Sequence, residues 1–429
     1  MTSFAAPAAS VRSREISRNE LFLAAGAIGL IAIHVLDDNF FQPQPGTSAG
    51  DHLISGLVPT VVLLGVAALY PKLRVGGRGA TALLLGVLGI AIGAGEAGYY
   101  TLRGGPSSDD YTGLIALVAG FILVGLGAVV LWKSRRRDDA LLWRYSRRLM
   151  LTVGAVLLML VVVLPFSLTY AFTHSARTKT TVGKLGAPYE SVAFTTSDGL
   201  RLEGWYVPSK NGAAVVVFPG KKGTQQHARM LVRHGYGVLV FDRRGEGASE
   251  GDPNAFGWAF NRDLKASAAF LQTRPDVDRD RIGGIGLSVG GEMLLQTAAE
   301  SKLFKAVVSD GAGSRSYRED LDQPGSGKWL QLPSSLVITA GTALFSNQGP
   351  PPNLKSLVPR IAPTPVFFIY VAHGAGGEGN NPLYYAAASE PKQIWRIPDA
   401  SHTHGLSRHS KEYERRVVGF FDEMLPKGA

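Results

Sequence analysis

The chain of 429 residues contains no cysteine, which excludes disulfide bonds, a thiolate nucleophile and cysteine-ligated metal sites. Charged residues are also scarce, at 18% of the sequence against 45% for hydrophobic residues. A net charge of +10 would suit a protein that binds nucleic acid. Much of the excess charge, however, lies between long apolar stretches in the first part of the chain, so we expect no nucleic-acid partner.

The long apolar stretches are concentrated before residue 175. Most reach the roughly 20 residues that a helix needs to cross a hydrocarbon core about 30 Å thick. The first follows three arginines but lacks a small-residue cleavage site, so we interpret it as a retained helix rather than a signal peptide. The sequence therefore predicts an all-α, polytopic transmembrane domain over residues 1–174, with spans at about 21–36, 53–70, 79–98, 111–132 and 149–172.

The connections between these spans differ sharply in charge. The first and third connections together carry only one lysine or arginine, Arg103. The N-terminus and the second and fourth connections together carry thirteen basic residues: Arg12, Arg14, Arg18, Lys72, Arg74, Arg78, Lys133, Arg135, Arg136, Arg137, Arg144, Arg147 and Arg148. Basic residues favour the cytoplasmic side. We therefore expect an integral protein of the cell membrane with a cytoplasmic N-terminus, and everything after Phe172 outside the cytoplasm.

The pattern changes after a polar linker at residues 175–188. Short apolar runs bounded by turns predict strands at 189–195, 202–207, 213–218, 237–241, 281–285, 304–309, 366–371 and 393–397. Helical stretches lie between them, at 225–233, 261–272, 292–300 and 411–424. This alternation predicts an α/β domain over residues 189–429, with a mostly parallel sheet and flanking helices. Ligands of such sheets bind at the carboxyl ends of the strands.

One predicted strand runs directly into Gly286-Leu287-Ser288-Val289-Gly290-Gly291. A short apolar run that ends in Gly-x-Ser-x-Gly and continues as a helix is typical of a nucleophile elbow. Two further motifs are Asp242-Arg243-Arg244-Gly245-Glu246-Gly247-Ala248-Ser249 and Pro398-Asp399-Ala400-Ser401-His402. From about residue 189 to its end, the chain thereby resembles the α/β-hydrolase superfamily of the serine-hydrolase type. The membrane part resembles no family that we recognise.

The resemblance implies a nucleophile, an acid and a base in that chain order. A serine hydroxyl needs a base, and the base needs a carboxylate that fixes its tautomer. Ser288 and His402 fill the first and last places, with His404 as the alternative base. Glu378 is the only carboxylate in the loop after strand 366–371, and Asp310 is the alternative acid. Asp242 is expected to hold its own turn, and we expect neither a metal nor a cofactor.

Two features complete the expected site. The backbone N–H of Val289 is the first candidate for an oxyanion hole. The second donor should lie in the loop after Phe218; since Pro219 has no N–H, we expect it at Lys221. Residues 311–363 separate two strands by far more than a usual connection, which predicts a cap insertion with an apolar stretch at 329–345.

These observations predict a membrane-anchored serine hydrolase that cleaves carboxylic esters through an acyl-serine intermediate. Its expected partners are a small-molecule ester or lipid substrate and the lipid bilayer. Two alternatives remain open: a serine peptidase of the prolyl-oligopeptidase-like type, and a membrane protein whose hydrolase-like domain binds a ligand without catalysis.

Overall fold

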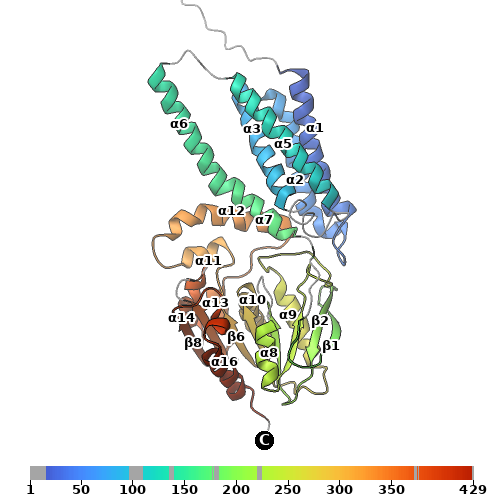
Figure 1. The fold of residues 1–429 in the computed structure, drawn as a ribbon, viewed down its shortest axis with the longest axis vertical. Coiled ribbons are helices and arrows are strands. Elements are labelled where there is room, and N and C mark those ends of the chain that lie inside the picture. The colour runs from blue at the N-terminus through green and yellow to red at the C-terminus, as the bar shows by residue number, and fades with distance from the viewer. Residues whose placement is uncertain are drawn as a thin grey trace, which may run out of the picture. The chain divides into compact units, whose positions relative to one another are not determined.

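The computed structural model describes residues 16–95, 110–134, 140–175, 177, 183–219, 225–371, 374 and 376–427. The chain forms two compact units. The first, Met1–Pro43 with His52–Ser167, is helical. The second, Gln44–Asp51 with Leu168–Ala429, holds the sheet (Figure 1).

Five helical segments in the described part of the chain are long and apolar enough to cross a membrane, as predicted. The first four contain α1 (Arg18–Leu36), which continues as a π-helical turn to Phe41, α2 (Leu53–Leu69), α3 (Val75–Gly93) and α5 (Asp110–Lys133). The fifth joins α6 (Leu141–Leu158), a π-helical turn (Met159–Val163) and α7 (Leu164–Thr173).

The fifth segment begins earlier than the sequence suggested. Its 33 residues would extend about 50 Å as a helix, which exceeds a hydrocarbon core of about 30 Å. Arg144, Arg147 and Arg148, predicted to lie in a connection, are therefore on the first turns of this helix. The extra length leaves room for these charged turns outside the hydrocarbon.

Glycines line the contact between α3 and α5. They recur every seventh residue and pair in antiparallel order, Gly79 with Gly127, Gly86 with Gly120 and Gly93 with Gly113. A Cβ at Gly86 would lie 2.8 Å from the carbonyl oxygen of Gly120. Small residues let two helix backbones approach closely in a membrane. No larger side chain would fit this glycine seam without separating the helices.

The second unit contains an eight-stranded sheet in the order β1-β2-β4-β3-β5-β6-β7-β8. Strand β2 runs antiparallel to β1 and β4, and all other pairs are parallel, which confirms the mostly parallel sheet. The strands are β1 (Glu190–Thr195), β2 (Arg201–Val207), β3 (Ala214–Phe218), β4 (Gly237–Phe241), β5 (Ile282–Leu287), β6 (Ala306–Asp310), β7 (Val366–Val371) and β8 (Lys392–Ile397).

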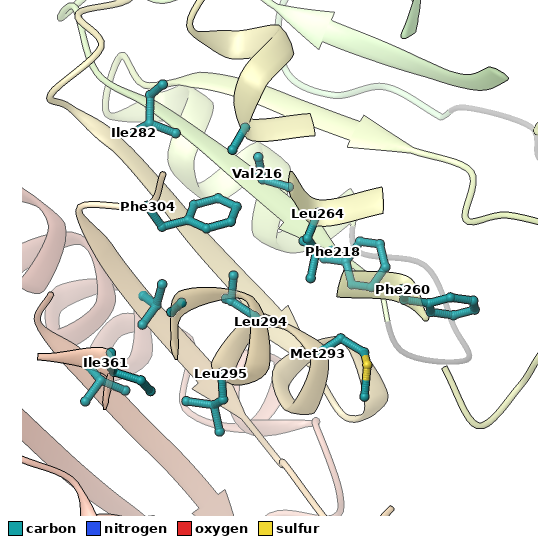
Figure 2. Packing of buried hydrophobic residues seen from close by; sticks show 14 of the residues in the cluster. Val216, Phe218, Phe260, Leu264, Ile282, Met293, Leu294, Leu295, Phe304 and Ile361 are labelled. Carbon is teal, nitrogen blue, oxygen red and sulfur yellow. The ribbon is translucent and has the colours of Figure 1, made fainter. Parts of the chain in front are cut away.

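Helices cover both faces of this sheet. Every residue of β3 and β5 is buried, as expected for strands covered on both sides. One face packs against α9 (Phe260–Leu271) and α10 (Val289–Glu300); Figure 2 shows Leu264 and Met293 from these helices beside Phe218. The other face packs against α8 (Gln225–Arg233) and α16 (Ser410–Met424).

The predicted insertion is helical. After β6 come α11 (Tyr317–Asp322), α12 (Lys328–Ser346), α13 (Leu354–Leu357) and a 3-10 turn (Val358–Ile361). The last two elements contribute Leu354, Leu357, Val358 and Ile361 to the core beside α10. The base of the insertion is held by Arg315, whose buried guanidinium pairs with Glu319 at 2.9 Å and donates to Gln296 at 2.7 Å.

The Asp-Arg-Arg-Gly turn after β4 is held by its own carboxylate, as expected. Asp242 accepts a hydrogen bond from the Ala248 N–H at 3.2 Å. A Cβ on Gly247, whose φ is +53°, would overlap the Asp242 carboxylate. The neighbouring Arg244 is buried in an ion pair with Asp263 at 2.6 Å. These contacts give the turn that follows β4 a structural role.

Candidate active site

Ser288 lies at a sharp turn between β5 and α10. Its backbone angles are φ 55° and ψ −125°, a sparsely populated region that persists only where the surroundings enforce it. A Cβ on Gly286 would overlap the carbonyl of Gly290, and a Cβ on Gly290 would lie 2.8 Å from the carbonyl oxygen of Phe218. The two glycines of the motif are therefore required by close backbone packing, and the turn leaves the serine hydroxyl accessible.

The imidazole of His402 contacts the serine. Its Nε2 lies 2.9 Å from Ser288 Oγ, and about 30% of the side chain is exposed. The ring rests against Gly311, where a Cβ would lie only 3.1 Å from Cε1. The alternative base, His404, is exposed, and its Nδ1 lies 2.8 Å from the carbonyl oxygen of His402. His402 is thus the histidine that the fold brings to Ser288.

The carboxylate that contacts His402 is Glu378. Its Oε2 lies 2.7 Å from His402 Nδ1, while its Oε1 accepts a hydrogen bond from the Val371 N–H at 2.8 Å. The side chain is fully buried, and a Cβ on Gly374 would overlap Oε2. The alternative acid, Asp310, instead accepts a hydrogen bond from Tyr413 at 2.7 Å.

One of the two expected donors of the oxyanion hole, Val289, lies among the described residues. Val289 is the first residue of α10, and the first N–H groups of a helix have no carbonyl of their own helix to bind. Its N–H is therefore free of the helix and next to Ser288. The other expected donor, Lys221, lies outside the described residues.

Comparisons with known proteins find chains that are similar to this one. The family model described as X-Pro dipeptidyl-peptidase (S15 family) matches residues 173–372. The uncharacterized protein Rv2307c of Mycobacterium tuberculosis is 38% identical over 224 residues, which cover 49% of this chain and 71% of the relative. The C-terminal domain of this chain belongs to the α/β-hydrolase superfamily.

Two further matches are an uncharacterized protein and a solved esterase. The uncharacterized protein YfhR of Escherichia coli K12 is 29% identical over 248 residues, covering 54% of this chain and 80% of the relative. The solved esterase Pf2001 of Pyrococcus furiosus is 22% identical with a TM-score of 0.46, covering 58% of this chain and 98% of that chain. The predicted fold class of the hydrolase domain is confirmed.

Three carboxyl groups surround the imidazole in this hydrolase domain. The hydrogen bond that the imidazole donates to Glu378 is the main cause that raises the pKa of His402. Burial opposes this effect, and the charges of Asp310 and Glu292 add to it. Burial raises the pKa of Asp310 and that of Glu292 to about 7 each. Glu378, whose Oε2 lies 2.7 Å from Nδ1, is the carboxylate closest to the base.

Polar side chains fix the loop that carries Glu378, and they were not identified from the sequence. Asn381 donates to the carbonyl oxygens of Ala312 at 2.7 Å and Glu378 at 2.8 Å, joining the loops that follow β6 and β7. Tyr384 donates to the carbonyl of Gly313 at 2.9 Å. These residues act through backbone carbonyls, which leave no recognisable motif.

Proposed function

We propose that this protein is a membrane-anchored serine hydrolase that cleaves carboxylic esters through an acyl-serine intermediate. The observation that carries the proposal is the continuous series of hydrogen bonds from Ser288 Oγ through His402 to Glu378. This arrangement matches the roles of nucleophile, general base and orienting carboxylate.

The first half of the reaction acylates the serine. His402 Nε2 accepts the proton of Ser288 as Oγ attacks the ester carbonyl carbon, and Glu378 stabilises the resulting imidazolium. The oxyanion of the tetrahedral intermediate is held by the Val289 N–H and by a donor from the loop after β3, for which Lys221 is our candidate. The intermediate then breaks its bond to the alkoxide, which takes the proton from His402 and leaves as an alcohol.

The second half releases the acid. A water molecule attacks the carbonyl carbon of the acyl-serine while His402 Nε2 accepts its proton. The new tetrahedral intermediate collapses, the bond to Ser288 Oγ breaks, and His402 returns the proton to the serine. The products are a carboxylic acid and the free enzyme, with no net change in protonation of the three side chains.

Lipid-like esters are the substrates that we propose. The hydrolase domain is tied to the fifth candidate span by a linker of about fifteen residues, which reaches no more than ~50 Å when fully extended. The domain therefore stays near a bilayer surface. The apolar helix α12, in the insertion after β6, supports a hydrophobic acyl chain rather than a polar one.

We expect kcat/KM to rise with acyl length for p-nitrophenyl esters of two to twelve carbons. Each added CH₂ that leaves water contributes up to ~0.8 kcal/mol, or about fourfold in rate. The comparison substrate is a dipeptide X-Pro p-nitroanilide, because the match to X-Pro dipeptidyl-peptidases favours a peptidase as the second candidate. Faster cleavage of the anilide than of every ester would favour the peptidase, and a preference for acetate would reject lipid-like substrates.

We further propose that the N-terminus is cytoplasmic and the hydrolase domain extracytoplasmic, as the distribution of basic residues favours. A cysteine at Lys184, in the linker, should react with a membrane-impermeant maleimide in intact cells. A cysteine at Ala140, before α6, should react only after the cells are permeabilised. The chain has no cysteine of its own, so all labelling reports the introduced site. The reverse pattern would place the hydrolase domain in the cytoplasm.

A further inference from the structure

The outer face of α12 is apolar and uncharged. Its exposed positions are Trp329, Leu330, Gln331, Pro333, Leu336 and Ala340, and the side chain of Leu330 is 87% exposed. No charged residue occurs between Lys328 and Lys355. A helix that faces water normally presents charged or polar residues there, and a contiguous exposed apolar surface marks an interaction site.

Another face of α12 contacts the hydrolase unit itself. Ser335 and Thr339 face α11, where Ser335 donates to Asp320 and Thr339 accepts from the Tyr317 N–H at 2.8 Å. The spacing of Trp329, Pro333, Leu336 and Ala340 places them on one separate face, because residues three and four apart are neighbours on a helix. The apolar face therefore remains uncovered when the helix is docked.

The end of the fifth candidate span packs on the C-terminal half of α12. A Cβ on Gly341 would overlap the hydroxyl of Thr169, and the rings of Tyr170 and Phe345 meet edge to face at 5.2 Å. All four residues belong to the second compact unit. Since Leu141–Thr173 forms one candidate span, α12 lies in side-chain contact with the point at which that span ends.

We propose that α12 lies in the plane of the membrane–water interface, with Trp329, Leu330 and Leu336 inserted among the lipid headgroups and upper acyl chains. This inference rests on the membrane anchoring in the proposed function and identifies the surface that meets the lipid. A helix of 19 residues is about 28 Å long. Amphipathic interfacial helices bury an apolar face that carries Trp and Leu about 5–10 Å deep.

The bilayer is the occupant that chain continuity favours. The last turn of the span fixes the C-terminal half of α12 at the membrane surface, whatever else binds there. Trp329 is suited to the interface because indole rings concentrate at that depth. Lys328 begins the helix and donates to the carbonyl of Leu321 at 2.7 Å, which places the one charge of α12 at its end and off the apolar face. A second copy of the chain is the competing occupant.

Site-directed spin labelling tests this assignment in the full-length protein, reconstituted in phosphatidylcholine nanodiscs. Leu330→Cys and Leu336→Cys carry nitroxide labels, whose collisions with lipid-soluble oxygen and with a water-soluble nickel complex are compared. We expect oxygen to dominate at both sites. The matched control is Arg415→Cys on α16, where 75% of the side chain is exposed and nickel should dominate.

Nickel accessibility at Leu330 and Leu336 equal to that at Arg415 would overturn the proposal. Dipolar broadening between two labels at Leu330 would overturn it in favour of a second copy of the chain. A label at Val118, which is 58% exposed on α5, reports membrane insertion separately. If collisions with oxygen dominate at Val118 but collisions with nickel dominate at Leu330, only the interfacial helix is rejected. If collisions with nickel dominate at Val118, the membrane anchoring is rejected. Neither the collision accessibilities nor the dipolar broadening depends on hydrolytic activity, so the test is independent of the proposed reaction.

Discussion

Replacing Ser288 by alanine is expected to abolish both ester hydrolysis and labelling by a fluorophosphonate probe. The hydroxyl oxygen is the proposed nucleophile, and alanine removes it while keeping the Cβ that the strained turn already accommodates. Loss of the serine in a triad of this kind costs about 10⁶-fold in kcat. The measurements are kcat for a medium-chain p-nitrophenyl ester and probe incorporation into the purified protein.

His404→Ala is the matched control for this experiment. It removes an exposed imidazole whose Nδ1 lies 2.8 Å from the carbonyl oxygen of His402, so activity and labelling should stay near those of the unchanged protein. A labelled Ser288→Ala variant would place the nucleophile elsewhere. An unchanged protein that neither reacts with the probe nor hydrolyses any ester would favour the ligand-binding alternative.

Glu378→Gln is expected to lower kcat by about 10⁴-fold, the loss seen when the orienting carboxylate of a triad becomes an amide. The amide can donate to Nδ1 and thereby hold the proton of His402 on Nε2, the nitrogen that must accept the proton of Ser288. Asp310→Asn, by contrast, keeps an acceptor for the Tyr413 hydroxyl and leaves the Glu378 contact intact. We expect it to lose less than about tenfold.

The pH dependence distinguishes the two variants independently of rate. The neutral imidazole is the base, so kcat/KM falls as pH falls through the pKa of His402, which Glu378 raises above its ordinary value. Removing the carboxylate charge lowers that pKa, and the acidic limb of the profile should move to lower pH. Asp310 contributes less to the raised pKa, so its variant should shift the limb less. A larger loss and shift for Asp310→Asn would make Asp310 the acid.

Much of the fold could be predicted because the local patterns were unambiguous. The fully apolar β3 and β5 read as buried strands, and the glycines around Ser288 indicated a turn in which backbone atoms nearly touch. The order of the motifs made His402 the candidate base. The strands and the turn depend on neighbours within a few residues, where sequence patterns carry the most information.

The sequence left two candidates for the acid, because Asp310 and Glu378 follow adjacent parallel strands. The contact that distinguishes them comes from a distant residue. Tyr413, 103 residues further along the chain than Asp310, donates a hydrogen bond to the Asp310 carboxylate. Because Gly374 has no Cβ, there is room beside it for the Glu378 carboxylate. The start of the fifth helical segment was missed for another reason, since three arginines near its beginning are typical of a connection.

The glycine seam between α3 and α5 also fixes how far these two helices can change in length. One inserted residue would turn every following glycine by about 100° away from its partner, whereas seven inserted residues return it to within about 20°. Only steps of seven, each about 10.5 Å of helix, preserve the contact. Such a step is about a third of a hydrocarbon core roughly 30 Å thick, so the two helices can change in length only in coarse steps if the seam is kept.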